Sequence, residues 1–166
     1  MRRREWLAAS AAAWAGSACY GFAGGGLPPE VRTVAILPFD NQTPEPALTQ
    51  EINLAVKEAV QNRLGLLPAG EEQAHALVRG QIVRYEPDLP VAFQGGQSQQ
   101  QVNVTRRLVQ ISVNVEITDQ KRNRPLFQRS GLLCQGDYEP GREVEGRRRA
   151  LQFLTNQIVE GAQSQW

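Results

Sequence analysis

The sequence predicts an α+β fold, a two-layer sandwich in which two helices cover one face of a four-stranded mixed sheet. Two observations carry this prediction. Apolar residues recur at steps of three and four within residues 47–64 and again within 142–163, which is typical of amphipathic helices. Between them, residues 109–118 alternate strictly between apolar and polar, which is typical of a strand with one buried face. The expected order is strand, helix, strand, strand, strand, helix.

The first strand and the first helix are expected next to each other in the chain. Residues 31–39 are mostly apolar, which predicts a strand buried on both faces, and a proline-containing turn follows at 40–46. The helix 47–64 should begin after Pro46 and end at Gly65. Its apolar stripe comprises Leu48, Ile52, Ala55, Val56, Ala59, Val60 and Leu64.

A long polar stretch separates the second strand from the third. Residues 76–86 predict a strand that ends at Pro87. The stretch 87–103 contains Gly95, Gly96 and a cluster of glutamines, and such a composition is typical of a loop that cannot bury a core. We therefore expect a mobile hairpin loop at this place, followed by the alternating strand.

A tight turn, a fourth strand and a second helix complete the predicted domain. The basic turn 119–125 leads into a returning strand at 126–135, in which Gly131 is a candidate for a β-bulge. The closing helix covers residues 142–163. Its inner stripe comprises Val144, Leu151, Leu154, Ile158 and Ala162.

The first 18 residues have the features of a secretory signal peptide. Three consecutive arginines precede an Ala-rich apolar run over residues 6–18, which is shorter than the roughly 20 residues that span a bilayer. Cys19 follows Gly16-Ser17-Ala18, as the acylated cysteine follows small residues in bacterial lipoproteins. We expect residues 1–18 to be removed, Cys19 to be lipidated, and residues 19–30 to form a flexible Gly- and Pro-rich tether. An ordinary cleavage that leaves a free thiol is the alternative.

The composition argues against catalysis and against nucleic-acid binding. The net charge is +1, and the chain without residues 1–18 has 15 basic and 16 acidic residues, far from the basic excess that nucleic acids require. His75 is the only histidine, and Cys19 and Cys134 are the only cysteines, which excludes the common structural zinc sites within one chain. We therefore expect that the protein is not an enzyme and that it binds no cofactor and no metal. A hydrolase with paired carboxylates is a weak alternative.

The segment from Leu27 to Leu48, LPPEVRTVAILPFDNQTPEPAL, resembles the opening of the LptE family of lipopolysaccharide-assembly lipoproteins. The start Cys19-Tyr20-Gly21-Phe22 is also similar to that of those mature proteins, and the later elements fall in the expected order. The resemblance implies a domain over residues 31–166, held by a lipid on the periplasmic face of the outer membrane. The resemblance also implies that the domain binds lipopolysaccharide and the large LptD β-barrel, and that it partly fills the lumen of that barrel. A lipoprotein of similar fold that regulates another envelope machine, such as a peptidoglycan synthase, is the alternative.

Lipid A phosphates, which this resemblance implies as ligands, require cationic partners. Arginine is well suited because its planar guanidinium donates several hydrogen bonds at once. The candidates are Lys121, Arg122 and Arg124 in the turn between the last two strands, and Arg106 and Arg107 before the alternating strand. The alternative for the turn is that its basic residues only keep the hairpin soluble.

Overall fold

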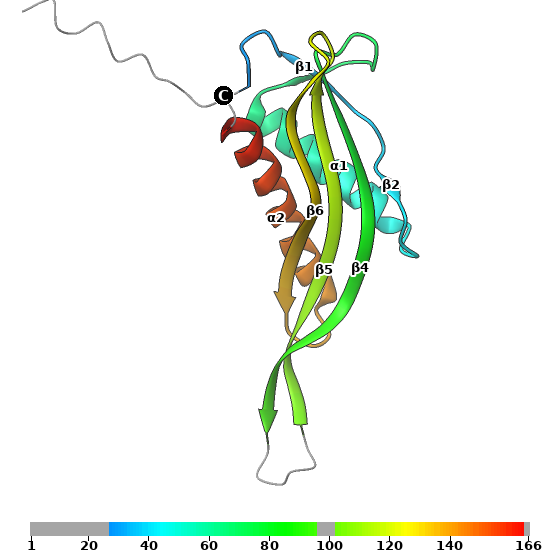
Figure 1. Cartoon of the computed structure of the whole chain (residues 1–166). Coiled ribbons are helices and arrows are strands. Elements are labelled where there is room, and N and C mark those ends of the chain that lie inside the picture. The colour runs from blue at the N-terminus through cyan, green and yellow to red at the C-terminus, as the bar shows by residue number, and fades with distance from the viewer. Residues whose placement is uncertain (1–26, 96–101, 165–166) are drawn as a thin grey trace, which may run out of the picture.

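The computed structural model describes residues 27–95 and 102–164, so the expected signal peptide, Cys19 and most of the tether lie outside the described residues. Within these bounds, α1 (Ala47–Leu64) and α2 (Glu143–Ser164) cover one face of a single mixed sheet (Figure 1). This arrangement confirms the predicted α+β class with both helices on one face. No helix of the described chain is both long and apolar enough to cross a membrane.

The described sheet has six strands rather than the expected four. Three long antiparallel strands make up most of it: β4 (Ala76–Gly95), β5 (Val102–Asp119) and β6 (Arg124–Tyr138). Three short strands complete it: β1 (Thr33–Ile36), β2 (Asp40–Asn41) and β3 (Leu67–Pro68). The strand order is β3-β1-β4-β5-β6, and β2 pairs in parallel with β4 beyond the end of β1.

The strand expected at residues 31–39 is shorter, because β1 covers only residues 33–36, and β2 lies within the turn expected at 40–46. The interruption falls at Pro38, which has no backbone N–H for the ladder, and at Phe39. The Phe39 backbone N–H donates to Asn53 Oδ1 of α1 at 3.1 Å. The buried Phe39 ring lies against Gly80 of β4, at the place where a side chain of residue 80 would be. The break between β1 and β2 thus places the Phe39 ring in the core, in the space that the missing side chain of Gly80 leaves.

The expectation that residues 87–103 form a loop is wrong, because β4 and β5 pair along most of this stretch, out to Gly95. Figure 1 shows the resulting hairpin extending past the rest of the sheet. Pairing of β4 with β2 ends at Ile82, so the outer part of β4 is an edge strand. Edge strands and bulges tolerate proline, and the register shifts on either side of the pair Leu89–Pro90 accommodate the prolines of this segment.

The core lies between the helices and the sheet. The helix bounds agree with prediction, since α1 covers residues 47–64 and α2 begins one residue later than expected. The main correction is Val144, which is 70% exposed, because Gly146 rather than Val144 meets the sheet in the first turns of α2. Fully buried side chains from both layers form the core: Leu48, Ile52, Val56, Val60, Val78, Val109, Ile111, Val113, Leu154, Ile158 and Ala162.

Two features of the β5–β6 hairpin confirm the sequence pattern. The apolar members of residues 109–117 are buried, whereas the intervening polar residues face away from the helices and are half-buried. Gly131 forms the predicted bulge, with a φ of 65° and a register shift opposite residues 113–115. Its backbone N–H donates to Asn114 Oδ1 at 2.7 Å, so the side chain of one strand fixes the bulge in the next.

Candidate functional site

The five predicted cations fall into two groups at opposite ends of the domain. Lys121, Arg122 and Arg124 lie at the β5–β6 turn, whereas Arg106 and Arg107 lie on β5 where the β4–β5 hairpin leaves the sheet (Figure 1). Twelve residues of extended strand separate Arg107 from the turn, which corresponds to roughly 40 Å. The two groups therefore cannot contact one phosphate group together.

The β5–β6 turn is held rigidly by the acid at its start. The Asp119 side chain is only 2% exposed, and its Oδ1 accepts the backbone N–H groups of Lys121 at 2.9 Å and Arg122 at 3.2 Å. Asn123 has a φ of 47°, a conformation that asparagine tolerates better than most residues. The side chains of Lys121 and Arg122 are exposed at this fixed turn.

The segment that leads into β1 reaches the same turn. Glu30 forms an ion pair with Arg122. A backbone hydrogen bond to Glu30 and the nearby Arg122 together hold the pKa of the Glu30 carboxyl below its usual value. Because Arg122 is matched by this carboxylate, its charge is less available to a ligand than that of Lys121. Among the described residues, Lys121 makes no ion pair.

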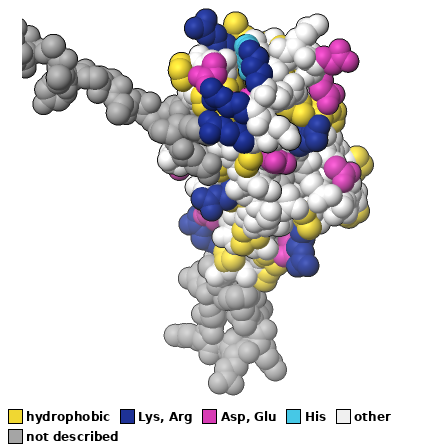
Figure 2. Space-filling view, turned by 45° about the horizontal axis from the view of Figure 1, so that its top comes forward, with side chains coloured by type: hydrophobic (Ala, Val, Ile, Leu, Met, Phe, Trp, Pro, Cys, Tyr) yellow, Lys and Arg dark blue, Asp and Glu magenta, His cyan; other side chains and the backbone are white. Residues whose placement is uncertain are grey.

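His75 connects the start of β1 to the turn. Its ring Nδ1 accepts hydrogen bonds from Thr33 Oγ1 at 2.8 Å and from the backbone N–H of Arg32 at 3.4 Å. The His75 carbonyl accepts the backbone N–H of Gln120 at 2.9 Å. Figure 2 shows Lys and Arg side chains beside this single histidine at the end of the molecule.

Arg32 is a cation at this end that the sequence did not indicate. Its side chain is exposed and makes no ion pair in the described part of the chain. No local pattern distinguishes Arg32, because its position beside His75 depends on the parallel pairing of β1 with β4. The signal that could have indicated it is its place one residue before a buried strand, at the same end as the turn.

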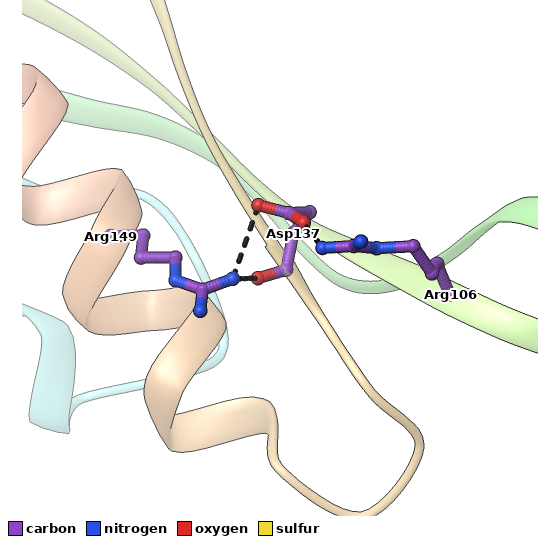
Figure 3. Close-up of polar contacts among 3 residues, drawn as sticks. All are labelled: Arg106, Asp137 and Arg149. Atoms are coloured by element: carbon purple, nitrogen blue, oxygen red, sulfur yellow. Dashed lines mark hydrogen bonds and ion pairs between the residues drawn. The ribbon is translucent and has the colours of Figure 1, made fainter.

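Arg106 takes part in a cluster of ion pairs and hydrogen bonds around Asp137, between the sheet and α2 (Figure 3). Its guanidinium forms an ion pair with the Asp137 carboxylate. Arg149 Nη1 donates to the backbone oxygen of Asp137 at 2.6 Å and to its Oδ1 at 3.2 Å. Partial desolvation would raise the pKa of Asp137, but Arg106 and Arg149 outweigh it and the pKa is lowered. Asp137 thus ties β5, β6 and α2 together.

Arg107 takes part in a second polar cluster, around Asp88, at the base of the β4–β5 hairpin. It forms an ion pair with Asp88, and this hydrogen bond holds the pKa of Asp88 below its usual value. The Tyr138 hydroxyl donates to the carbonyl of Pro87 at 2.6 Å. A surface hollow of about 350 Å³ lies beside these groups and is lined by Glu143 as well. Arg106 and Arg107 are therefore both matched by carboxylates that fix the geometry of the hairpin.

The face of the sheet without helices is mostly polar, with Leu133 as an exposed apolar side chain, and it carries a continuous chain of hydrogen bonds. Gln81 donates to Asp40 Oδ2 at 3.1 Å, and Asn114 donates to Gln81 Oε1 at 3.3 Å while accepting from the Gly131 backbone. This chain crosses β2, β4, β5 and β6 beside a hollow of about 310 Å³. No group of three or more His, Cys, Asp or Glu side chains that could hold a metal ion occurs within residues 27–95 and 102–164.

A family model described as LptE, lipopolysaccharide-assembly, matches residues 31–162. A search of curated proteins gives no match. Among solved structures, the chain is similar to a minor lipoprotein from Acinetobacter baumannii, with 15% identity over 81% of this chain and 92% of that chain and a TM-score of 0.49. It is similar to the PelC dodecamer from Paraburkholderia phytofirmans, with 13% identity, coverage of 81% and 92%, and a TM-score of 0.46. It is also similar to lipoprotein GNA1162 from Neisseria meningitidis, with 11% identity, coverage of 78% and 96%, and a TM-score of 0.45.

Proposed function

Because the chain belongs to the LptE family of lipopolysaccharide-assembly proteins, we propose that it is a lipoprotein that assists lipopolysaccharide assembly at the outer membrane. In this proposal Cys19 carries the lipid anchor on the periplasmic face, after removal of residues 1–18. The domain binds an LptD-type β-barrel and lipopolysaccharide, and it acts by binding rather than by catalysis. The observation that carries the proposal is the family match over nearly the whole folded domain, residues 31–162.

The polar face of the sheet supports binding inside a barrel. A protein that partly fills the lumen of a large barrel meets a polar, hydrated wall, because the interiors of such barrels are polar. The helix-free face of the sheet presents amide and hydroxyl groups along β5 and β6, including Gln110, Asn114 and Gln135. A surface of this kind can exchange its water for hydrogen bonds to a lumen wall, and the exposed Leu133 on the same face adds one apolar contact.

The contact with lipid A phosphates is placed at the β5–β6 turn in this proposal. We name Lys121, Arg122 and Arg124 the basic turn. Asp119 fixes the backbone of the basic turn, and Lys121 projects from it without an ion pair among the described residues. Arg106 and Arg107 are weaker candidates, because Asp137 and Asp88 already match their charges. A phosphate at those positions would have to compete with a carboxylate.

The test of the phosphate contact is lipopolysaccharide binding by the variant Lys121→Ser/Arg122→Ser/Arg124→Ser in detergent. We expect the affinity to fall at least about tenfold, since one lost charge-assisted hydrogen bond costs about 1.5 kcal/mol or more. The matched control is Arg84→Ser/Arg129→Ser/Arg142→Ser, which removes three exposed cations elsewhere on the surface. Equal affinities for the two variants would exclude the basic turn as the phosphate contact.

The anchor and the partner need separate experiments. Radiolabelled palmitate should be incorporated into the wild-type protein and not into Cys19→Ala, and label that persists in this variant would refute acylation at Cys19. Purification from detergent-solubilised envelopes should recover a large outer-membrane barrel. Recovery of a cell-wall synthase without a barrel would favour the alternative, a lipoprotein that regulates another envelope machine.

A further inference from the structure

We propose that the end of the domain around the first described residue, Leu27, rests on the anionic phospholipid headgroups of the membrane that holds Cys19. We name Arg32, Leu67, Lys121 and Arg122 the tether face. The inference rests on the proposed lipid anchor and adds an orientation of the domain relative to the membrane, together with a contact of defined chemistry.

The residues of the tether face are linked through the segment before β1, which contains Glu30 and Arg32. The backbone N–H of Leu67 donates to the Arg32 carbonyl at 2.9 Å, which joins β3 to the segment before β1. Glu30, two residues before Arg32, forms the ion pair with Arg122 in the basic turn. The chain therefore enters the described domain between the exposed Leu67 and the exposed Lys121.

The length of chain between Cys19 and Leu27 restricts the orientation. Eight residue steps separate the two, so their Cα atoms are at most about 29 Å apart in any backbone conformation. The opposite end, at Arg107, lies roughly 40 Å from the turn along β5. An inverted domain, with Arg107 at the membrane, would have to span most of this length with the eight residue steps before Leu27. The short tether of an anchored Cys19 thus favours the orientation in which Leu27, and not the β4–β5 hairpin, lies at the membrane.

The chemistry of the tether face suits an interface between headgroups and acyl chains. Leu67 is 65% exposed and lies beside Arg32. Juxtamembrane cations are attracted to anionic lipids, and an adjacent apolar side chain can enter the headgroup layer.

The acids at this end are largely matched or buried. Glu30 pairs with Arg122, Glu71 pairs with Arg79 at 3.8 Å, and Asp119 is used within the turn. Glu72 is exposed and makes no ion pair in the part of the chain that the structure describes. Arg32 and Lys121 therefore supply the cationic character of the tether face.

The orientation can be measured with single cysteines on the acylated protein in vesicles of phosphatidylethanolamine and phosphatidylglycerol. Gln73→Cys places a fluorophore beside His75 without changing the tether face, and Glu139→Cys places the same fluorophore at the other end. Cys134 is fully buried and its burial raises the pKa of the thiol to about 12, so labelling is confined to the introduced cysteine. We expect nitroxide-headgroup lipids to quench position 73 at least threefold more than position 139. Equal or reversed quenching would overturn the inference.

The contact itself is tested by Arg32→Glu/Leu67→Glu, which leaves the basic turn intact. In vesicles of phosphatidylethanolamine and phosphatidylglycerol, this variant should show at most half of the quenching at position 73 that the protein with an unchanged tether face shows. The protein with an unchanged tether face should show a similar loss of quenching when the vesicles contain only phosphatidylcholine. The matched control, Arg142→Glu/Val144→Glu, changes a cation and an exposed apolar residue at the opposite end and should leave quenching unchanged. Equal losses for the two variants would refute the contact.

The outcomes separate this inference from the proposed function. If the basic-turn variant loses lipopolysaccharide binding while position 73 stays unquenched in vesicles, the membrane contact is wrong and the proposed function stands. If position 73 is quenched while lipopolysaccharide binding does not depend on the basic turn, the membrane contact stands and the phosphate assignment fails. Absence of palmitate from the wild-type protein would overturn the anchor and the orientation together.

Discussion

Gly136 on β6 and Gly146 on α2 bring the backbone of a strand into direct contact with the backbone of a helix. The carbonyl oxygen of Gly146 occupies the space where a Cβ atom on residue 136 would lie. A Cβ on residue 146 would in turn lie 2.5 Å from Cδ1 of Tyr138. The two glycines therefore set how closely α2 approaches the sheet, and this approach brings Arg149 to Asp137.

Gly136→Ala should strongly destabilise the protein. The added methyl group would overlap backbone atoms, which cannot rotate away, so we expect a loss of about 2 kcal/mol or more in the free energy of unfolding. Urea denaturation followed by circular dichroism gives this value. Gly70→Ala is the control, since its Cβ would have its nearest neighbour at 3.7 Å, on the Gln73 side chain. Equal midpoints for the two variants would contradict the close contact.

Asn114→Ala should weaken the bulge in β6. The substitution removes the acceptor of the Gly131 N–H, and one such hydrogen bond contributes about 1 kcal/mol. We expect faster hydrogen exchange at the Gly131 amide together with a small loss of stability. Ser112→Ala changes the neighbouring outward-facing position on β5 and should leave that amide unaffected. Exchange that does not differ between the variants would show that the strand holds the bulge without Asn114.

Because of the ion pairs of Asp137, the stability of the protein should change with pH in the acid range. The pKa of Asp137 is lower in the folded protein than its usual value of 3.8, so the folded state holds its proton less tightly than the unfolded state does. The stabilising contribution is present above pH 4 and is lost as the pH falls through the lowered pKa. The contribution is modest because the side chain is 43% exposed.

The comparison of wild type with Asp137→Asn measures this contribution directly. The variant should be less stable at pH 7, and the difference between the two midpoints should shrink as the pH is lowered from 4 to 2. Glu139→Gln, two residues away on an exposed turn, is the matched control. A difference that stays constant over this range would show that Asp137 acts through packing and not through its charge.

Cys134 should be unreactive in the native protein. The side chain is fully buried on β6, and burial raises the pKa of its thiol to about 12, so almost no thiolate forms at pH 8. A maleimide should modify Cys134 only after denaturation, whereas Gln73→Cys should react at once. Rapid modification of Cys134 without denaturant would reveal local opening of β6.

The elements that the sequence predicted accurately are those whose signal is local. The α1 helix agrees with prediction at both bounds, because its apolar stripe repeats within the helix and Gly65 ends it with a φ of 67°. The alternation in residues 109–117 likewise reports which face of β5 is buried. In contrast, β3 has two residues and forms only because β1 lies beside it, and the pairing of residues 87–95 depends on β5. Such pairing leaves no periodic trace in either partner alone.

The sequence by itself determined the fold class, the family and the presence of cations near both ends of β5. Only the tertiary structure decided what surrounds each cation. Folding brings Asp137 and Asp88 to Arg106 and Arg107, 31 and 19 residues away in the chain, and it brings Arg32 to the end that carries Lys121. The availability of a charge to a ligand depends on the opposite charges within a few ångströms of it, and those distances are set by the packing of strands and helices that are remote in the sequence.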